Sequence, residues 1–215
     1  MRFKDRADAG RRLAAVLSRL ELLDPVVLAL PRGGVPVGFE IAAALNAPLD
    51  VFVVRKVGAP GHPEFGIGAI AEGGALVAHE DALRQVGLSL PEWDQLVLAE
   101  RAEVERRVEC YRGKRPLLRI EGRPVILVDD GLATGATAEA ALRALRAFEP
   151  SLLVLAVPTA SPQTAARLAV LADDVVFVIA PRDFSGVGQW YDEFAQTSDE
   201  EVVALLARAA TTPPP

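Results

Sequence analysis

The stretch that decides the fold is "VILVDDGLATGATAEAALRAL", from Val125 to Leu145. Four apolar residues lead straight into two adjacent aspartates, then a short Gly/Thr/Ala turn, then a segment of helical composition. A short continuous apolar run is typical of a strand covered on both faces. Adjacent carboxylates repel, and removing either from water is costly unless a cation or a hydroxyl-rich group meets it. A bound ligand is one candidate for that partner.

The turn after the aspartates has the composition of an anion site. Backbone amides in "ATGAT" (133–137) and in the first helical turn would point outward unpaired, and the helix dipole favours negative charge there. Gly135 permits a tight backbone, and the hydroxyls of Thr134 and Thr137 add donors for phosphate oxygens. Two carboxylates just upstream could accept hydrogen bonds from the vicinal hydroxyls of an attached sugar. The alternative is that Thr134 caps a helix and the aspartates form a solvated strand end.

Strands alternate with helices along the rest of the chain. Further apolar runs are "VVLAL" (26–30), "LDVFVV" (49–54), "LLVLAV" (152–157) and "VVFVI" (175–179). Such alternation predicts a parallel sheet with helices on both faces.

Other segments are predicted from composition and periodicity. Residues 58–74 are rich in Gly and Pro and predict a long loop or an irregular hairpin, a kind of segment that usually has a function. A charged helix is expected from Pro91 to about Arg112, and a final helix capped by Ser198.

Unusual residues follow two other predicted strands. Because ligands of open parallel sheets bind beyond the carboxyl ends of the strands, these residues are candidates for the site. They are "PRGG" (31–34) after the first run, and Arg55 and Lys56 at the end of the second. The alternatives are an ordinary turn and a salt-bridged strand end.

Composition narrows the class of protein. A chain of 215 residues suits a single domain, residues 1–215, and no apolar run reaches the roughly 18 residues of a membrane span. The net charge of −6 argues against nucleic acid as the main partner. The first ten residues lack an apolar signal core and Cys110 is the sole cysteine, so we expect a cytoplasmic location. One cysteine with two separated histidines, His62 and His79, predicts no metal cluster.

The motif as a whole resembles a known family signature. Four apolar residues, two acids, two variable residues, a small residue and Thr-Gly-x-Thr resemble the phosphoribosyl pyrophosphate motif of type I phosphoribosyltransferases. Gly131 departs mildly, because many members carry an apolar residue there. The chain looks closest to an uncharacterised bacterial branch of that family. The resemblance implies an α/β fold with a central, mostly parallel sheet flanked by helices, a flap at about 58–80, and a hood at about 181–197 plus the C-terminal helix.

The resemblance also implies the site residues. The residues expected to bind phosphoribosyl pyrophosphate are Arg32, Gly33, Gly34, Arg55, Lys56, Asp129, Asp130, Gly131, Ala133, Thr134, Gly135, Ala136 and Thr137. Catalytic roles are expected for Asp129, Asp130 and Lys56. In that family the loop corresponding to "PRGG" turns its amides toward pyrophosphate, often through a cis peptide. Mg²⁺ would be held mainly by substrate and water, with no direct protein ligand.

The implied reaction is magnesium-dependent transfer of phosphoribosyl from phosphoribosyl pyrophosphate to a nitrogenous acceptor, such as a nucleobase. Trp190 and Tyr191 are expected at the acceptor, with Trp190 pointing inward and Tyr191 nearer the acceptor; alternatively both rings pack the final helix. Small-molecule substrates are the expected partners, and a homodimer is left open. One rival function is a non-catalytic regulator that senses phosphoribosyl pyrophosphate. The other is a hydrolase, for which His62 and His79 are the available bases.

Overall fold

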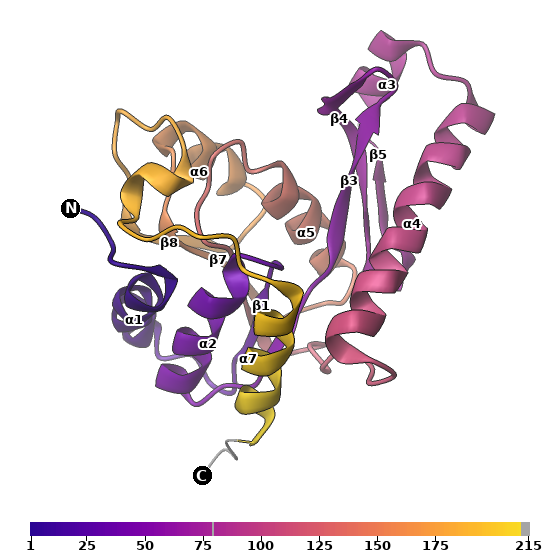
Figure 1. Cartoon of the computed structure of the whole chain (residues 1–215). Helices are drawn as coiled ribbons and strands as arrows, with labels where there is room; N and C mark the ends of the chain where they lie inside the picture. Colours follow the sequence, from indigo (N-terminus) through magenta and orange to yellow (C-terminus); the bar gives the residue numbers. More distant parts are fainter. Residues whose placement is uncertain (79, 212–215) are drawn as a thin grey trace.

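A computed structural model describes residues 1–78 and 80–211, without the side chains of residues 63 and 64. Its centre is a five-stranded sheet in the order β2-β1-β6-β7-β8, in which every neighbouring pair is parallel (Figure 1). The strands are β1 (Val26–Ala29), β2 (Leu49–Val51), β6 (Pro124–Val128), β7 (Leu152–Thr159) and β8 (Asp174–Ile179). All four residues of β1 are buried, as its continuous apolar run predicts. The predicted parallel α/β fold is confirmed.

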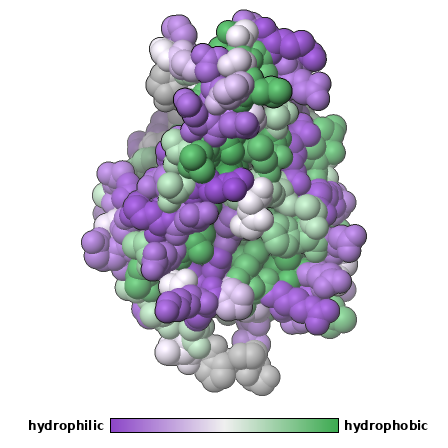
Figure 2. All heavy atoms as spheres, turned by 90° about the vertical axis from the view of Figure 1, so that its right-hand side faces the viewer, coloured by the Kyte–Doolittle hydropathy of each residue, from purple (hydrophilic) through white to green (hydrophobic). Residues whose placement is uncertain are grey.

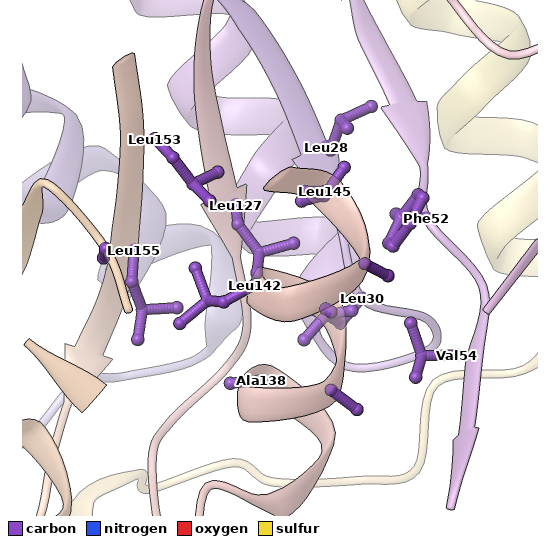
Figure 3. Close-up of a cluster of buried hydrophobic side chains, with 14 of the residues drawn as sticks. Leu28, Leu30, Phe52, Val54, Leu127, Ala138, Leu142, Leu145, Leu153 and Leu155 are labelled. Carbon is purple, nitrogen blue, oxygen red and sulfur yellow. The ribbon is translucent and has the colours of Figure 1, made fainter. Parts of the chain in front are cut away.

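Helices cover both faces of this sheet. On one face, α1 (Arg6–Leu17) and α2 (Gly34–Leu45) bury apolar side chains against β1, β6 and β7. On the other face lie α5 (Ala136–Arg146) and α6 (Pro162–Leu168). Figure 3 shows Leu142 of α5 near Leu127 and Leu155 of the sheet, and Leu145 near Leu28. These contacts fix where α5 begins, at the carboxyl end of β6.

A second, antiparallel sheet projects from the first and forms an arm (Figure 1). It consists of β3 (Val54–Ala59), β4 (His62–Ala71) and β5 (Leu76–Ala78), followed by α3 (Glu80–Val86) and α4 (Leu90–Arg112). The hairpin alternative for residues 58–74 is therefore confirmed, with register shifts around Gly58. The charged helix ending at Arg112 is confirmed as α4.

The predicted strand over residues 49–54 is wrong in extent. The amide of Phe52 still bonds Ala29 of the central sheet, at 3.0 Å, but the carbonyl of Val53 accepts from the amide of Glu72 in the arm, at 2.9 Å. The chain therefore changes sheets between these two residues. One apolar run supplies strands to two sheets, which a pattern of burial alone does not reveal.

The N-terminal residues pair with the hood segment. The hood segment contains a short 3-10 helix, Val187–Trp190, and pairs with the N-terminus through a bridge between Phe3 and Tyr191. The amide of Phe3 donates to Trp190 at 2.8 Å, and that of Asp192 donates to Phe3 at 2.9 Å. The final helix, α7 (Asp199–Thr211), packs on α2 and α4.

The Ser198 hydroxyl caps α7 by accepting from the amide of Glu201, at 3.2 Å, as predicted. Within the described part of the chain, none of the helices has the length and apolar character that crossing a membrane demands.

Candidate active site

Two loops meet at the carboxyl edge of the central sheet. The "PRGG" loop joins β1 to α2, and its Pro31–Arg32 peptide bond is cis. A Cβ atom added to Gly33 would lie 2.0 Å from Oδ2 of Asp130, and one added to Gly34 would lie 2.6 Å from the carbonyl oxygen of Val128. No side chain fits at either position without displacing the loop that follows β6. The structure therefore brings the two predicted loops into direct contact.

The two aspartates have unequal surroundings. The carboxylate of Asp129 accepts a hydrogen bond from the amide of Asp130 at 2.9 Å. Asp130 is bound by a cation that the sequence did not indicate: Nε and Nη2 of Arg6, from α1, lie 2.9 and 2.8 Å from its Oδ2 atom. The Arg6 and Asp130 side chains are only 12% and 15% exposed. The sequence predicted that the buried aspartates need a cationic or hydroxyl partner. For Asp130 that partner is Arg6 of the protein itself.

Burial raises the pKa of both carboxyl groups. For Asp129 the charge of Asp130 raises the pKa further, so its value lies well above the ordinary one. For Asp130 burial is again the largest cause, and the Arg6 guanidinium counteracts it through charge and hydrogen bonds. The loop thus holds two acids that ionise unequally, with Asp130 the one that has a cation.

The turn over residues 133–137 has the geometry of an anion site. Gly135 has φ 74° and ψ 8°, the left-handed conformation that its position at the start of α5 requires, and no side chain caps the helix. The first amides of α5 therefore lack intrahelical partners. Thr134 and Thr137 are both exposed, so their hydroxyls are accessible beside these amides.

Two side chains of helix α6 hold this turn through hydrogen bonds. The Thr164 hydroxyl donates to the carbonyl of Ala133 at 2.7 Å, and the Arg167 guanidinium donates to that of Thr134 at 2.6 Å. Because carbonyls are held on the α6 side, the exposed amides of the turn face away from α6. A Cβ atom on Gly135 would lie 2.6 Å from Cγ2 of Thr164.

The hood segment accounts for the glycine at position 131, where many family members carry an apolar residue. A Cβ atom there would lie 2.5 Å from Cγ1 of Val187, in the short hood helix. Val187 thus fills the space that a side chain at position 131 would otherwise take. The departure from the family pattern is compensated within this chain.

The predicted basic pair does not flank a strand end. Arg55 and Lys56 lie inside β3, where successive side chains point to opposite faces. Arg55 faces α4 and pairs with Glu100, Nε to Oε2 at 2.8 Å. Lys56 shares the face of Val54, which packs in the cluster that includes α5. The salt-bridge alternative thus describes Arg55, and Lys56 alone lies on the α5 side of the arm.

The predicted orientation of the aromatic pair is wrong. Tyr191 is 1% exposed, with ring centroids of Phe3 and Phe194 at 5.4 and 4.9 Å, and its hydroxyl donates to the carbonyl of Asp130 at 2.6 Å. Burial, together with the nearby Asp130 charge, raises its pKa. Because other rings pack against Tyr191, it has no free face for stacking on an acceptor. Its hydroxyl instead holds the backbone of Asp130 in place. Trp190 is only partly buried, and its indole N–H has no partner among the described residues.

Arg32 points away from the acid pair. One of its guanidinium nitrogens lies 3.8 Å from Oδ1 of Asp199, at the start of α7, and that oxygen also accepts from the Tyr111 hydroxyl at 2.6 Å. In this structure the "PRGG" loop meets the acid pair through Gly33, and the Arg32 side chain ties the loop to α7.

A buried ion triad joins the arm to the central sheet. Arg112, at the end of α4, pairs with Glu72 of the arm and with Asp50 of β2, the latter at 3.5 Å. All three side chains are at most 6% exposed. The signal in the sequence was a single acid within each of two apolar stretches, "LDVF" and "AIAEGG". Arg6 gave no such signal, because an arginine near a chain end is usually solvated.

The sequence predicts that Mg²⁺ would be held by oxygens of the substrate and by water, with no protein ligand. In the part of the chain that the structure describes, no group of three or more His, Cys, Asp or Glu side chains could hold a metal by itself. His62 is exposed at the tip of the arm, and His79 lies outside the described residues.

The chain resembles known proteins over nearly its whole length. It is 49% identical over 207 residues to two Mycobacterium tuberculosis proteins, each named "Putative phosphoribosyl transferase". The match covers 96% of this chain but 47% of each relative, so the chain spans about half the length of these curated relatives.

Solved structures resemble it as well. The crystal structure of the protein TT1426 from Thermus thermophilus is 47% identical, with a TM-score of 0.87 over 97% of this chain and 99% of that one. A hypothetical protein from Neisseria gonorrhoeae with bound ppGpp shares the fold at 13% identity, with a TM-score of 0.50 over 97% of this chain and 98% of that one. The family model of the phosphoribosyl transferase domain matches residues 2–184. The chain therefore belongs to the phosphoribosyl transferase domain family.

Proposed function

We propose that the protein transfers the 5-phosphoribosyl group from phosphoribosyl pyrophosphate to a nitrogenous acceptor and releases pyrophosphate. The observation that carries this proposal is the contact of Gly33 with Asp130, which joins the "PRGG" loop to the acid pair beside an uncapped helix start. A sugar carrying phosphate groups at both ends needs a site of this composition: amides at two places, with carboxylates between them. Membership of the family supports the same reaction.

Each part of the site has a proposed role. The amides and hydroxyls of residues 133–137 would bind the 5-phosphate, where the dipole of α5 favours negative charge. The "PRGG" loop and Lys56 would face the pyrophosphate, and Asp129 and Asp130 the ribose hydroxyls. Mg²⁺ bound to the substrate would neutralise pyrophosphate charge. Trp190 is the aromatic residue that we propose near the acceptor.

The acid pair gives the site its catalytic power in this proposal. As the bond from ribose to pyrophosphate breaks, positive charge develops on the sugar. An ionised carboxylate stabilises that charge more in the transition state than in the ground state, and this difference raises the rate. Asp130 is the better candidate for the ionised partner, because Arg6 accompanies it.

Pyrophosphate release tests the proposal. The protein is incubated with Mg²⁺, phosphoribosyl pyrophosphate and a panel of nucleobases, and pyrophosphate is measured with and without each base. Release that depends on one base supports transfer. Release without any base would indicate a hydrolase, and tight binding without release would indicate a sensor. Asp130→Asn serves as the matched variant, with an expected fall in turnover larger than its fall in affinity.

A further inference from the structure

Arg6 is held on several sides at once. Its Nε and Nη2 atoms bind Oδ2 of Asp130, and its Nη1 atom donates to the carbonyl of Ala195 at 2.6 Å. The guanidinium also lies over the ring of Phe194, 4.0 Å from its centroid. An arginine so placed loses little further freedom when it binds a carboxylate. Arg6 thus has one fixed geometry, which the hood imposes.

Asp130 is oriented from three directions by this arrangement. Arg6 binds its carboxylate, the Tyr191 hydroxyl donates to its carbonyl, and Gly33 leaves no room on the Oδ2 side. Both contacts of the guanidinium with the carboxylate go to Oδ2. The Oδ1 atom is therefore the oxygen that Arg6 leaves for a ligand.

We propose that Arg6 is a positioning residue, which fixes one oxygen of Asp130 so that the other meets the sugar of the substrate. This inference rests on the proposed function. Arg6 does not touch substrate in this account; it acts through Asp130. The N-terminal helix thereby becomes part of the site, although its sequence carries no motif of the family.

The physical reason is the cost of a buried carboxylate. Three ionisable groups contact Asp130: Arg6 from α1 binds its carboxylate, whereas Asp129 and the Tyr191 hydroxyl of the hood bind its backbone amide and carbonyl. Of these only Arg6 favours the charged form; Asp129 and burial favour the neutral form. Loss of Arg6 would therefore raise the pKa of Asp130 further and disfavour its ionised form, which is the form that stabilises a positive sugar.

The first test measures the acid directly and needs no substrate. Carboxyl ¹³C NMR on protein labelled at aspartate follows the titration, and the signals are assigned by their loss in Asp129→Asn and Asp130→Asn. We expect Arg6→Gln to move the Asp130 midpoint upward by about one pH unit or more, about tenfold in proton affinity. Arg11→Gln, on the same helix at an exposed pair with Glu40, leaves the midpoint unchanged. An unchanged midpoint in a folded Arg6→Gln protein overturns the proposal.

The second test separates positioning from folding. Arg6→Lys keeps a charge but cannot bind with two nitrogens, so we expect a smaller shift of the midpoint and partial recovery of turnover relative to Arg6→Gln. The acid limb of the pH profile should move upward in Arg6→Gln and stay in place in Arg11→Gln. Turnover and pH profile equal to wild type in Arg6→Gln would overturn the proposal. A wild-type protein that neither binds nor turns over phosphoribosyl pyrophosphate would refute the proposed function instead, and the NMR titration distinguishes the two failures.

Discussion

Asp129 and Asp130 are neighbours in sequence but differ in what their charges cost. Asp130 shares its buried position with Arg6, whereas Asp129 has its adjacent acid and no cation within hydrogen-bonding distance among the described residues. A site that binds a sugar must contain buried carboxylates even when no sugar hydroxyl is present to donate hydrogen bonds to them. Function and stability are therefore expected to oppose each other at this loop.

Asp129→Asn should make the protein more stable at neutral pH. Because the folded-state pKa of Asp129 is raised, its carboxyl is most compatible with folding below the unfolded pKa, about 3.9, and destabilises as pH rises through the folded value. Asparagine removes the charge but keeps an oxygen for the amide of Asp130. We expect a gain of about 1 kcal/mol or more at pH 7 that disappears near pH 4. Urea unfolding at both values measures it, and a variant less stable than wild type at pH 7 would contradict the account.

Gly135→Ala should destabilise the turn itself. The left-handed backbone is unfavourable for alanine, and the new Cβ would meet Thr164 of α6 at 2.6 Å. We expect a loss of about 1–3 kcal/mol in thermal or urea unfolding. Gly186→Ala is the matched control, because its backbone is extended and no atom lies within 4 Å of the added Cβ. Equal losses in the two variants would show that the conformation of Gly135 is not the cause.

At the scale of elements, the joint between the arm and the central sheet rests on buried charge. Arg112 of α4 meets Glu72 and Asp50 where the chain passes from β2 to β3. Burial raises the pKa of both acids, and the guanidinium of Arg112 counteracts it. A triad of this kind connects three elements. Both buried carboxyl groups depend on one cation, however, and both would lose their partner if Arg112 were removed.

Arg112→Met should therefore be strongly destabilising. It leaves two buried carboxyl groups without their cation, at an expected cost of about 3–5 kcal/mol at pH 7. The loss should shrink on acidification, since both acids then bind protons. Arg106→Gln, on the same helix at an exposed pair with Glu103, should change stability by less than about 1 kcal/mol. Urea denaturation compares them, and similar midpoints for the two variants would be the contradicting result.

Sequence patterns predicted the elements of the central sheet better than those of the arm. The run over residues 125–128 is buried on both faces, so its apolar composition was sufficient. The arm is less apolar and rich in glycine, and its strands depend on pairing between β3 and β4, which composition does not encode. Local turn chemistry at Gly135 was likewise predictable. The roles of Arg6 and the burial of Tyr191 were not predictable, because both depend on contacts between the N-terminal segment and the hood, which are far apart in sequence.

At the scale of the whole molecule, the proposed site combines segments that are far apart in sequence. Its parts come from the N-terminus, the ends of β1 and β6, the arm and the hood, around one edge of the sheet (Figure 1). The side of the molecule that carries α4 shows hydrophobic side chains among charged ones (Figure 2), and Leu98 in α4 is 66% exposed.

The homodimer, the cytoplasmic location and the absence of a nucleic-acid partner stay predictions.

The central claim is that one edge of the sheet binds the 5-phosphate, the sugar and the pyrophosphate of phosphoribosyl pyrophosphate. Isothermal calorimetry with Mg²⁺ tests it by comparing three ligands: phosphoribosyl pyrophosphate, ribose 5-phosphate and inorganic pyrophosphate. Because the turn at residues 133–137 and the "PRGG" loop would act on the same molecule, the complete ligand should bind at least about tenfold more tightly than either fragment, on the order of 1.4 kcal/mol. Equal affinity for the complete ligand and for pyrophosphate, or no binding of the complete ligand, would contradict the account.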